Sequence, residues 1–476
     1  MRRIDDNRLL IERSGDMHVD ALIYTDESMA QQIESGAIDQ LRDAARLPGV
    51  YRAVGTPDMH FGFGVPIGVV VALEDYVVPA AVGYDINCGM RVITTPLDAA
   101  EVDVDQLAGS IARDIPLGEG KNNVSLSRDK LEVILNEGVA GIAKVAGGGH
   151  RVWEARDSEE EKRDMECIEE NGSMDGDSSK LSNHAVSRGL KQLGTLGGGN
   201  HFVEMQVVEE VHNAEAAEAF GLREKQLVIM LHSGSWGLGH QVCGDYAKLA
   251  KKINGDRSPG RELCFLRASD KAGRDYIGAM NAAANFAFAN RQLMTLFVRM
   301  NVRHHYGGDL PMPIIYDVPH NMAKREGFEG RDLWVHRKGA TRAFPPSKMA
   351  GTRFEKTGQP VLIPGSMGTP SYVLIGKEAS AESLYSVNHG AGRCMSRTAA
   401  RGKVTRKGKV LRPGKISDQE FRDSMAGIKL ICANRHMIKE EAPQAYKDID
   451  HVIRIVVGAG LAEVVAKMRP LAVLKG

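Results

Sequence analysis

The sequence has no excess of charge of either sign. Its 476 residues include 61 lysines and arginines and 61 aspartates and glutamates, so the formal net charge at pH 7 is zero. A protein that binds nucleic acid through its overall charge would be strongly basic. Any contact with nucleic acid must therefore come from a local basic patch, which a balanced total still allows.

Long apolar runs, disulfide patterns and targeting segments are also missing. No stretch approaches the roughly 18 uncharged apolar residues of a membrane-spanning helix. The first residues, MRRIDDNRLLIERSGD, lack the apolar core of a signal peptide. The six cysteines are scattered without the spacing of a disulfide framework. We therefore expect a reduced, cytoplasmic protein with no membrane partner.

Strand-like and helix-like segments do not alternate regularly, and no internal repeat is visible. Strands and turns are expected over 1–100, a mostly helical insert over 101–190 with an exposed, mobile acidic segment near 157–180, strands and glycine loops over 191–240, helices over 241–300 and near 418–440, and strands and loops after 310. Such an irregular order favours an α+β fold over a doubly wound sheet.

Glycine is the one residue in clear excess. The chain has 52 glycines in 476 residues, about 11%, against a usual share of roughly 7%. They gather in short runs such as LGTLGGG, HSGSWGLGH and HGAGR, several of them beside histidines. Because glycine allows close approach of the backbone to a ligand, these runs predict one large site built from loops.

Four of these loops carry residues that can bind metal ions. They contain Asp85 and Cys88 in VGYDINCGMR, Asn200, His201 and Glu204 in LGTLGGGNHFVE, His232 in LHSGSWGLGH, and His320 in YDVPHN. Imidazole, carboxylate and thiolate suit first-row transition ions and do not suit Ca²⁺ or Mg²⁺. Taken alone, each residue is also explained by a structural role: such a histidine is more often a hydrogen-bonded structural residue, a lone buried cysteine is usually a small apolar residue, and Asp85 can cap a turn. The four loops together favour a metal site.

A fifth loop, VNHGAGRCMSR, places His389 before Gly390, Ala391 and Gly392. Backbone N–H groups of such small residues can hold a phosphate while the imidazole attacks it. The alternative is a glycine-rich turn with a surface histidine.

Further residues near these glycine runs can contact phosphate. Arg393 and Arg397 follow His389 and can neutralise nucleotide or RNA phosphates. Ser366 and Ser371 in PGSMGTPSYV indicate another possible nucleotide-binding loop, which lacks the lysine spacing of a P-loop.

Taken together, nine motifs resemble the RtcB family of RNA-splicing ligases. They are VGYDINCGMR, LGTLGGGNHFVE, HSGSWGLGH, DVPHN, VHRKGATRAF, PGSMGTPSYVL, HGAGRCMSR, EAPQAYKDID and the terminal PLAVLKG, in this order from about residue 50 to the last residue. The resemblance implies a single large catalytic domain over 1–476. It also implies mixed β-sheets with flanking helices around a central cleft for metal and GTP.

The family's chemistry then suggests roles for the loops. The resemblance implies two Mn²⁺ ions bridged by Cys88, with Asp85 and His201 at one ion and His232 and His320 at the other. His389 would attack the α-phosphate of GTP and become guanylylated. GMP would pass to an RNA 3′-phosphate, and a 5′-hydroxyl would displace it and seal the strand. A 2′,3′-cyclic phosphate would first be hydrolysed.

The resemblance also implies the contacts with GTP and RNA. Guanine would be read by Glu204, Ser371, Tyr446 and Lys475, and the GTP phosphates would be held by Asn200, Gly390 and Gly392. Asp58 and His60 in PDMHFGFG belong to another family motif near the site, with no role assigned. RNA phosphates would be held by Arg188, Lys338, Arg393 and Arg397, whose alternative is a solvated basic face. An archease-like protein is a possible activating partner.

One position departs from the family pattern. Trp236 in HSGSWGLGH stands where the family usually has an arginine. A tryptophan cannot neutralise phosphate, although it could stack on a base or pack against a neighbour. The leading prediction is an RNA ligase. The alternatives are a relative that guanylylates or caps RNA 3′ ends but ligates weakly, a non-catalytic RNA-end-binding protein, and a metallophosphoesterase.

Overall fold

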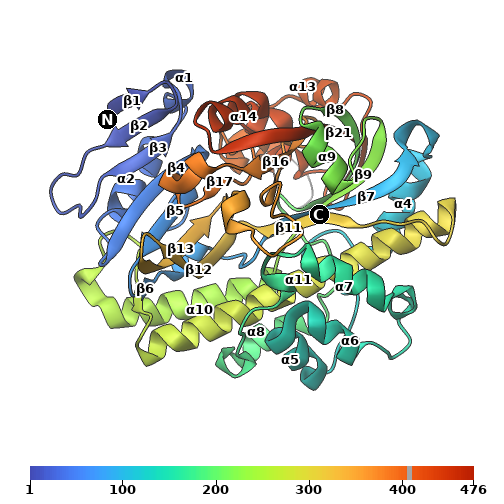
Figure 1. Cartoon of the computed structure of the whole chain (residues 1–476), viewed down its shortest axis with the longest axis horizontal. Coiled ribbons are helices and arrows are strands. Elements are labelled where there is room, and N and C mark those ends of the chain that lie inside the picture. The colour runs from blue at the N-terminus through green and yellow to red at the C-terminus, as the bar shows by residue number, and fades with distance from the viewer. Residues whose placement is uncertain (405–409) are drawn as a thin grey trace.

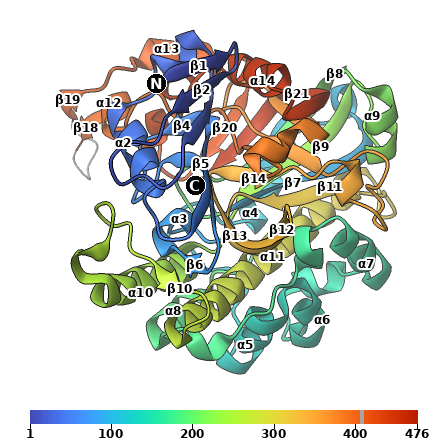
Figure 2. The ribbon, with the colours of Figure 1, turned by 60° about the vertical axis from the view of Figure 1, so that its left-hand side comes forward.

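A computed structural model describes residues 1–404 and 410–476. The helices within residues 128–189 and 236–306 gather at the bottom of the views, and two mixed β-sheets, with the remaining helices around them, lie above (Figures 1 and 2). This arrangement confirms the predicted α+β fold with mixed sheets and flanking helices. Within the described residues, no helix combines the length and apolar character needed to cross a membrane.

The first sheet has seven strands in the order β1-β2-β3-β4-β5-β13-β12. These strands are β1 (Arg2–Asp5), β2 (Arg8–Ile11), β3 (Ala21–Tyr24), β4 (Val50–His60), β5 (Ile67–Leu73), β12 (Asn321–Phe328) and β13 (Arg331–Lys338). Only β3 and β4 run parallel among these neighbours. A parallel pair needs a crossover connection, which here contains α1 (Glu27–Ala30) and α2 (Ser35–Ala44).

The second sheet has eight strands in the order β11-β7-β9-β8-β21-β16-β15, and β20 pairs with β21 beside this path. Its strands are β7 (Gly89–Asp98), β8 (Phe202–Val211), β9 (Gln226–Ser233), β11 (Ile314–Pro319), β15 (Pro360–Ile363), β16 (Ser371–Gly376), β20 (Lys429–Cys432) and β21 (Ala462–Lys475). The central strand β9 reads QLVIMLHS and is buried along its whole length. A continuous apolar run of this kind is typical of a strand covered on both faces.

Three short strand pairs complete the sheets. They are β6 (Tyr76–Val77) with β10 (Leu266–Arg267), β14 (Ala340–Arg342) with β17 (Ser386–Asn388), and β18 (Gly402–Val404) with β19 (Val410–Pro413). The pair β14–β17 matters for the site, because β17 ends one residue before His389.

The helices of the described chain vary widely in length. They are α1 (Glu27–Ala30), α2 (Ser35–Ala44), α3 (Pro79–Val82), α4 (Val104–Asp114), α5 (Arg128–Glu137), α6 (Gly141–Val145), α7 (Ser158–Glu166), α8 (Asn183–Gly189), α9 (Ala214–Phe220), α10 (Trp236–Asn254), α11 (Lys271–Tyr306), α12 (Arg397–Arg401), α13 (Asp418–Ser424) and α14 (Ile449–Gly458). Helices α4–α8 fall where the sequence predicts a helical insert. The helix expected near 418–440 is shorter than predicted, because β20 joins the second sheet directly after α13.

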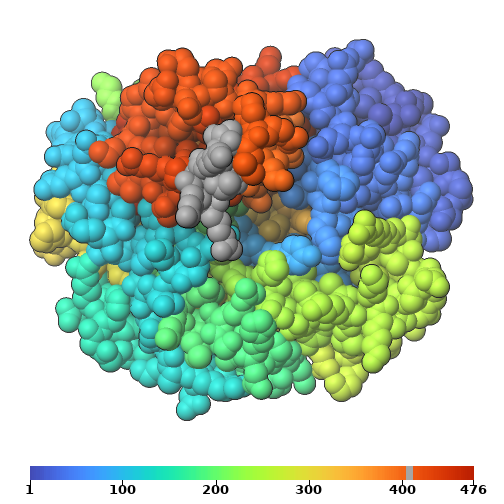
Figure 3. Space-filling view, turned by 180° about the vertical axis from the view of Figure 1, so that it is seen from behind, coloured from blue at the N-terminus to red at the C-terminus, as the bar shows by residue number. Residues whose placement is uncertain are grey.

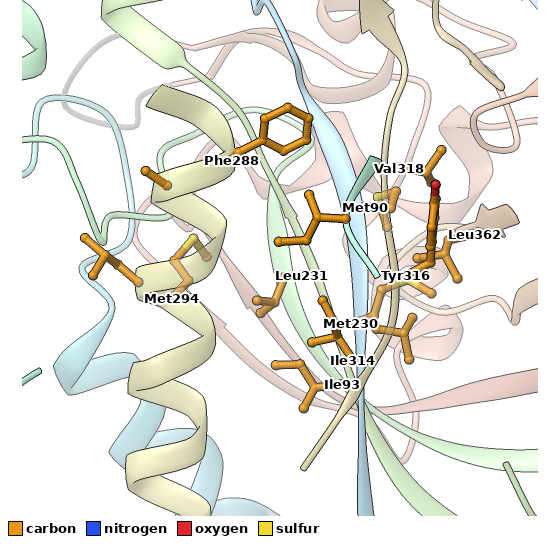
Figure 4. Packing of buried hydrophobic residues seen from close by; sticks show 14 of the residues in the cluster. Met90, Ile93, Met230, Leu231, Phe288, Met294, Ile314, Tyr316, Val318 and Leu362 are labelled. Atoms are coloured by element: carbon orange, nitrogen blue, oxygen red, sulfur yellow. The ribbon is translucent and has the colours of Figure 1, made fainter. Parts of the chain in front are cut away.

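Helix α11 is the main support of the second sheet. Its 36 residues are rich in alanine, a strong helix former, and nearly all from Ala279 to Val302 are buried. Figure 4 shows Phe288 and Met294 of this helix facing Leu231, Met230 and Ile93 of the neighbouring strands. The helix therefore fixes the strands whose ends carry the metal-competent residues.

The acidic segment near 157–180 differs from its prediction. Asp164 on α7 is buried and accepts two hydrogen bonds from Arg299 on α11, at 2.6 and 2.7 Å. Glu160 pairs with Arg303 at 2.8 Å, and the buried Glu169 pairs with Lys324. The prediction of an exposed segment is wrong for these three carboxylates, because cations of other elements compensate their charge.

Candidate functional site

The metal-competent side chains meet at one end of four adjacent strands of the second sheet. Cys88 lies just before β7, His201 just before β8, His232 near the end of β9, and His320 just after β11. The strands are antiparallel neighbours, with Gly89 opposite both Ser233 and Pro319, and Phe202 opposite His232. An antiparallel register places the start of one strand beside the end of the next. Segments far apart in sequence thus bring their side chains to one edge.

Cys88 lies at the centre of this group. Its Sγ is 3.1 Å from Nε2 of His201 and 3.1 Å from Nε2 of His232. The Nε2 atoms of His232 and His320 are 3.2 Å apart, and Nε2 of His201 is 2.9 Å from a carboxylate oxygen of Asp85. The residues form two overlapping sets, Cys88–His232–His320 and Asp85–Cys88–His201, each with ligand atoms within 4.8 Å of one another.

The burial of these groups fits them to hold cations. Burial, with the charge of Asp85, raises the pKa of the Cys88 thiol, and burial lowers the pKa of both His232 and His320 far below the usual range. Burial alone would raise the pKa of Asp85, but His201 and the Trp236 N–H hold it below its usual value. Imidazoles whose ring nitrogens converge on a sulfur and a carboxylate are suitable ligands for a borderline transition ion.

A buried arginine holds three of these loops together. Arg291 on α11 donates to the carbonyl oxygens of Asn87 at 2.7 Å and Ser233 at 2.9 Å, and to both carboxylate oxygens of Asp317 at 2.8 and 2.9 Å. Asn87 precedes Cys88, Ser233 follows His232, and Asp317 lies three residues before His320. The guanidinium is fully buried, so it positions the metal-competent loops from behind.

His389 approaches the same edge from the short β14–β17 pair. It follows β17, and its ring centroid lies 4.8 Å from that of His320. Its Nδ1 is 2.7 Å from Oδ2 of Asp58, a buried residue of β4 whose Oδ1 accepts from Thr56 at 2.6 Å. Burial would raise the pKa of Asp58, but the contact with His389 holds it below its usual value. Asp58 therefore fixes the imidazole by its Nδ1 edge.

The glycine three residues after His389 is required for steric reasons. Gly392 has φ +74°, and a Cβ there would lie 2.3 Å from the Asp58 carbonyl oxygen. The residue must be glycine for the loop to pass β4 closely enough to bring His389 onto Asp58.

A cavity of about 400 Å³ joins the metal-competent residues to His389. The predicted residues that line it are Asp85, Cys88, Asn200, Glu204, His232, His320, Lys338, Ser366, His389, Gly390, Ala391, Gly392, Arg393, Arg397, Tyr446 and Lys475, together with His60. Figure 3 shows the surface hollowed where blue, green and orange-red segments meet, and the lining comes from segments of these colours. His201 lines the neighbouring groove instead, and Ser371 is fully buried. Burial lowers the pKa of His60 to about 4.

The far end of the cavity holds opposite charges out of water. Lys475 of β21 pairs with Phe202 of β8, which lies two residues before Glu204. Side chains two residues apart on a strand share a face of the sheet, so Lys475 lies beside Glu204. Burial raises the pKa of Glu204 to about 7, against the effects of Gln206 and Lys475. Burial lowers the pKa of Lys475. This pair offers an acceptor and a donor to a polar ligand.

Two buried residues of this end were not predicted from the sequence. Glu441 accepts from the hydroxyl of Tyr446 and lies 3.7 Å from Nζ of Lys475 and 3.4 Å from Arg393. Gln206 donates to Glu204 at 2.7 Å and to Ser371 Oγ at 3.0 Å. The motif EAPQAYKDID contains Glu441, but nothing in its pattern separates it from a surface glutamate. Ser371 contacts the site through Gln206.

The predicted RNA-binding cations lie in different settings. Arg188 is exposed in a groove of about 660 Å³ that shares Asp85, Asn200 and Arg397 with the cavity. Arg397 is half exposed and pairs with Glu441 at 3.5 Å. Arg393 packs over the Tyr446 ring, 5.1 Å from its centroid. Lys338 is buried and donates to the carbonyls of Phe63 at 2.6 Å and Ala80 at 3.1 Å, so it lies inside the cavity wall instead of on a basic face.

Comparison with known proteins shows the family of the chain. Residues 40–476 match the protein family described as "tRNA-splicing ligase RtcB". The chain is 42% identical to "tRNA-splicing ligase RtcB" of Thermococcus kodakarensis, over all of this chain and 99% of that protein. It is 38% identical to the protein of the same name in Methanococcus maripaludis, over 97% and 95% of the two chains. It is also 40% identical to "RNA-splicing ligase RtcB homolog 1" of Entamoeba dispar, over 92% of this chain and 82% of that protein.

Proposed function

This chain belongs to the RtcB family of tRNA-splicing ligases, and from that premise we propose that it joins RNA ends with GTP and Mn²⁺ through guanylylated His389. It is an RNA ligase. The substrates we propose are a 3′-phosphate or 2′,3′-cyclic phosphate end and a 5′-hydroxyl end, as in tRNA splicing or RNA repair. The observation that supports the proposal is the placement of His389 between Asp58 and the metal-competent residues, in a cavity lined by the glycine-rich loop Gly390–Gly392.

His389 is the nucleophile in this proposal. With its Nδ1 proton held by Asp58, the lone pair on Nε2 is free to attack the α-phosphorus of GTP. A P–N bond forms, the bond to the β-phosphate breaks, and pyrophosphate leaves. Backbone N–H groups of Gly390, Ala391 and Gly392, with Asn200 and Ser366, are the proposed phosphate contacts.

Two Mn²⁺ ions would be held by the two overlapping ligand sets, with Cys88 common to both. When bound, the ions would offset the negative charge of the phosphates. The protein holds their ligands in position through Arg291 and keeps bulk water away by burial. This proposal requires the thiol of Cys88 to lose its proton when metal binds, because the thiolate is the ligand.

The second and third steps transfer the activated group. An oxygen of the RNA 3′-phosphate attacks the histidine-bound phosphorus, the P–N bond breaks, and a P–O–P bond joins GMP to the RNA. The 5′-hydroxyl of the other strand then attacks the RNA phosphorus and GMP leaves. Water must open a cyclic end before the first of these steps. Arg188, Arg393, Arg397 and Lys338 are the proposed contacts with RNA phosphates.

Guanine would be recognised at the charged end of the cavity. Ionised Glu204 can accept from the N1 and N2 hydrogens of guanine, and Lys475 can donate to O6, a pattern that adenine does not match. Tyr446 and Ser371, the latter through Gln206, would support this edge. Discrimination rests on buried polar groups that adenine would leave unpaired.

The test is transfer of radioactive phosphorus from α-labelled GTP to the protein in the presence of Mn²⁺. We expect an acid-labile label on the wild type and none on His389→Ala, while His212→Ala, a half-exposed histidine outside the cavity, labels normally. An unlabelled wild type, or a labelled His389→Ala variant, would refute the guanylyl-histidine.

A second candidate function follows from Trp236. Its indole lines the groove beside Arg188, at the position of an expected phosphate-binding arginine. If binding of the RNA phosphates is lost there, the protein would guanylylate itself and cap 3′ ends but join them poorly. RNA with a 3′-phosphate and a 5′-hydroxyl distinguishes the two, because capped ends without joined product would favour the second function. Dependence on an archease-like activator and a cytoplasmic location stay predictions.

A further inference from the structure

Trp236 has an unusual backbone conformation that points it toward Asp85. Its φ is +53°, a left-handed value that is rare for a bulky residue other than glycine. In this conformation its N–H donates to Oδ1 of Asp85 at 2.8 Å, at the start of helix α10. The helix terminus thereby stabilises the ionised carboxylate.

The indole contacts His201, which belongs to the same metal-competent set as Asp85. Its Nε1 donates to the carbonyl oxygen of Leu196 at 3.0 Å, and Nδ1 of His201 lies 3.2 Å from that same oxygen. The indole also packs edge-on against the His201 ring, with centroids 4.6 Å apart. The ring needs the bare backbone of Gly197, where a Cβ would lie 1.3 Å from an indole carbon. The loop LGTLGGG therefore makes room for this side chain.

From these contacts we propose that Trp236 is a positioning residue for Asp85 and His201, and that it is not a phosphate ligand. The proposal rests on the proposed metal site. The backbone of Trp236 orients the carboxylate, and its indole fixes the carbonyl and the ring that orient the imidazole. An indole does this without charge, because it donates one hydrogen bond and fills the space over Gly197. An arginine here would bring a cation beside the ligands of one metal ion.

The proposal predicts an asymmetry between the two ligand sets. Trp236 touches Asp85 and His201, whereas His232 and His320 are held by their own strands and by Arg291. Loss of the indole should weaken the binding of the ion held by Asp85 and His201 and leave the binding of the other ion unchanged. Partners that orient metal ligands typically contribute about tenfold to 100-fold in affinity.

The experiment titrates Mn²⁺ into full-length protein by calorimetry, without GTP or RNA. We expect wild type to bind two ions. In Trp236→Phe, which keeps a ring but loses the Nε1 donor, one ion should bind about threefold to tenfold more weakly. In Trp236→Ala, which removes the ring, one ion should bind about tenfold to 100-fold more weakly. The other ion keeps its affinity in both. Trp334→Phe, on β13 outside the cavity, is the matched control and should match wild type.

Several outcomes would overturn the inference. If wild type and Trp236→Phe bind two ions with equal affinities, Trp236 does not position the site, even if Trp236→Ala fails to fold. If Trp236 variants lose affinity for RNA but not for Mn²⁺, the indole is an RNA contact. If both ions weaken equally, the effect is a general loss of structure. If wild type binds no Mn²⁺, the proposed metal dependence itself fails, and this outcome is distinct from a failure of the role proposed for Trp236.

Discussion

Replacing Asp58 by asparagine tests how the nucleophile is oriented. The change keeps the size of a fully buried side chain and removes its charge. In the wild type, the carboxylate lies 2.7 Å from Nδ1 and 3.3 Å from the backbone nitrogen of His389. A hydrogen bond to a charged group contributes roughly 1.5–3 kcal/mol. At about 1.36 kcal/mol per factor of ten, the rate of guanylylation should fall about 10- to 150-fold.

A larger loss would have its own explanation. If the new amide turns its NH₂ toward His389, the imidazole must carry its proton on Nε2 and loses the attacking lone pair. A wrong tautomer of this kind costs on the order of 10,000-fold in serine proteases. The assay is the initial rate of labelling from α-labelled GTP at saturating GTP and Mn²⁺. Thermal unfolding serves as the control for the fold. A properly folded Asp58→Asn variant that labels within about twofold of wild type would refute this role of Asp58.

Two further predictions concern buried charges. Burial raises the pKa of Glu204 to about 7, so ionising it opposes folding, and the free energy of unfolding should fall as pH rises from about 4.5 to about 7. Glu204→Gln should flatten this dependence on pH, which is measured by urea unfolding at about pH 5 and about pH 8. The variant should also lose the preference for GTP over ATP, which is measured by competition in the labelling assay. An unchanged dependence of stability on pH would contradict the reasoning. Arg291→Lys leaves Asp317 and two carbonyls short of donors, so the free energy of unfolding should fall by about 3 kcal/mol or more and Mn²⁺ should bind more weakly. Arg331→Lys, an exposed pair with Glu74, is its control and should change stability by less than about 0.5 kcal/mol, and an equal effect of both changes would refute the role of Arg291.

The positions of the metal-competent loops could be predicted because they depend on local pattern. Each loop follows or precedes a run of apolar, β-branched residues, and strands in a sheet bring such ends together when their register is antiparallel. Cys88 and His232 therefore meet through the pairing of β7 with β9. The strand order itself was not predictable, because it depends on long-range pairing that leaves no local trace.

The burial of charged side chains was the feature least predictable from the sequence. The acidic segment of α7 looks like a solvated helix, yet Asp164 is buried because Arg299 and Gln292 on α11 reach it. Lys338 looks like a surface cation and is instead inside the cavity wall. A charged side chain is buried only when a partner exists, and the partner is often more than a hundred residues away. Glu441 was missed for the same reason.

The two halves of the site come from different sheets, and this has a mechanical consequence. The second sheet supplies Cys88, His232, His320 and the Glu204–Lys475 end, whereas the first sheet supplies Asp58, which orients His389. The halves touch where the rings of His320 and His389 lie 4.8 Å apart. Gly392 allows this approach, because any Cβ there would push the nucleophile loop away from β4. The distance from His389 to the metal-competent residues therefore depends on how the sheets pack, so we expect that a change at their interface can slow the proposed guanylylation without touching a metal-competent residue or His389.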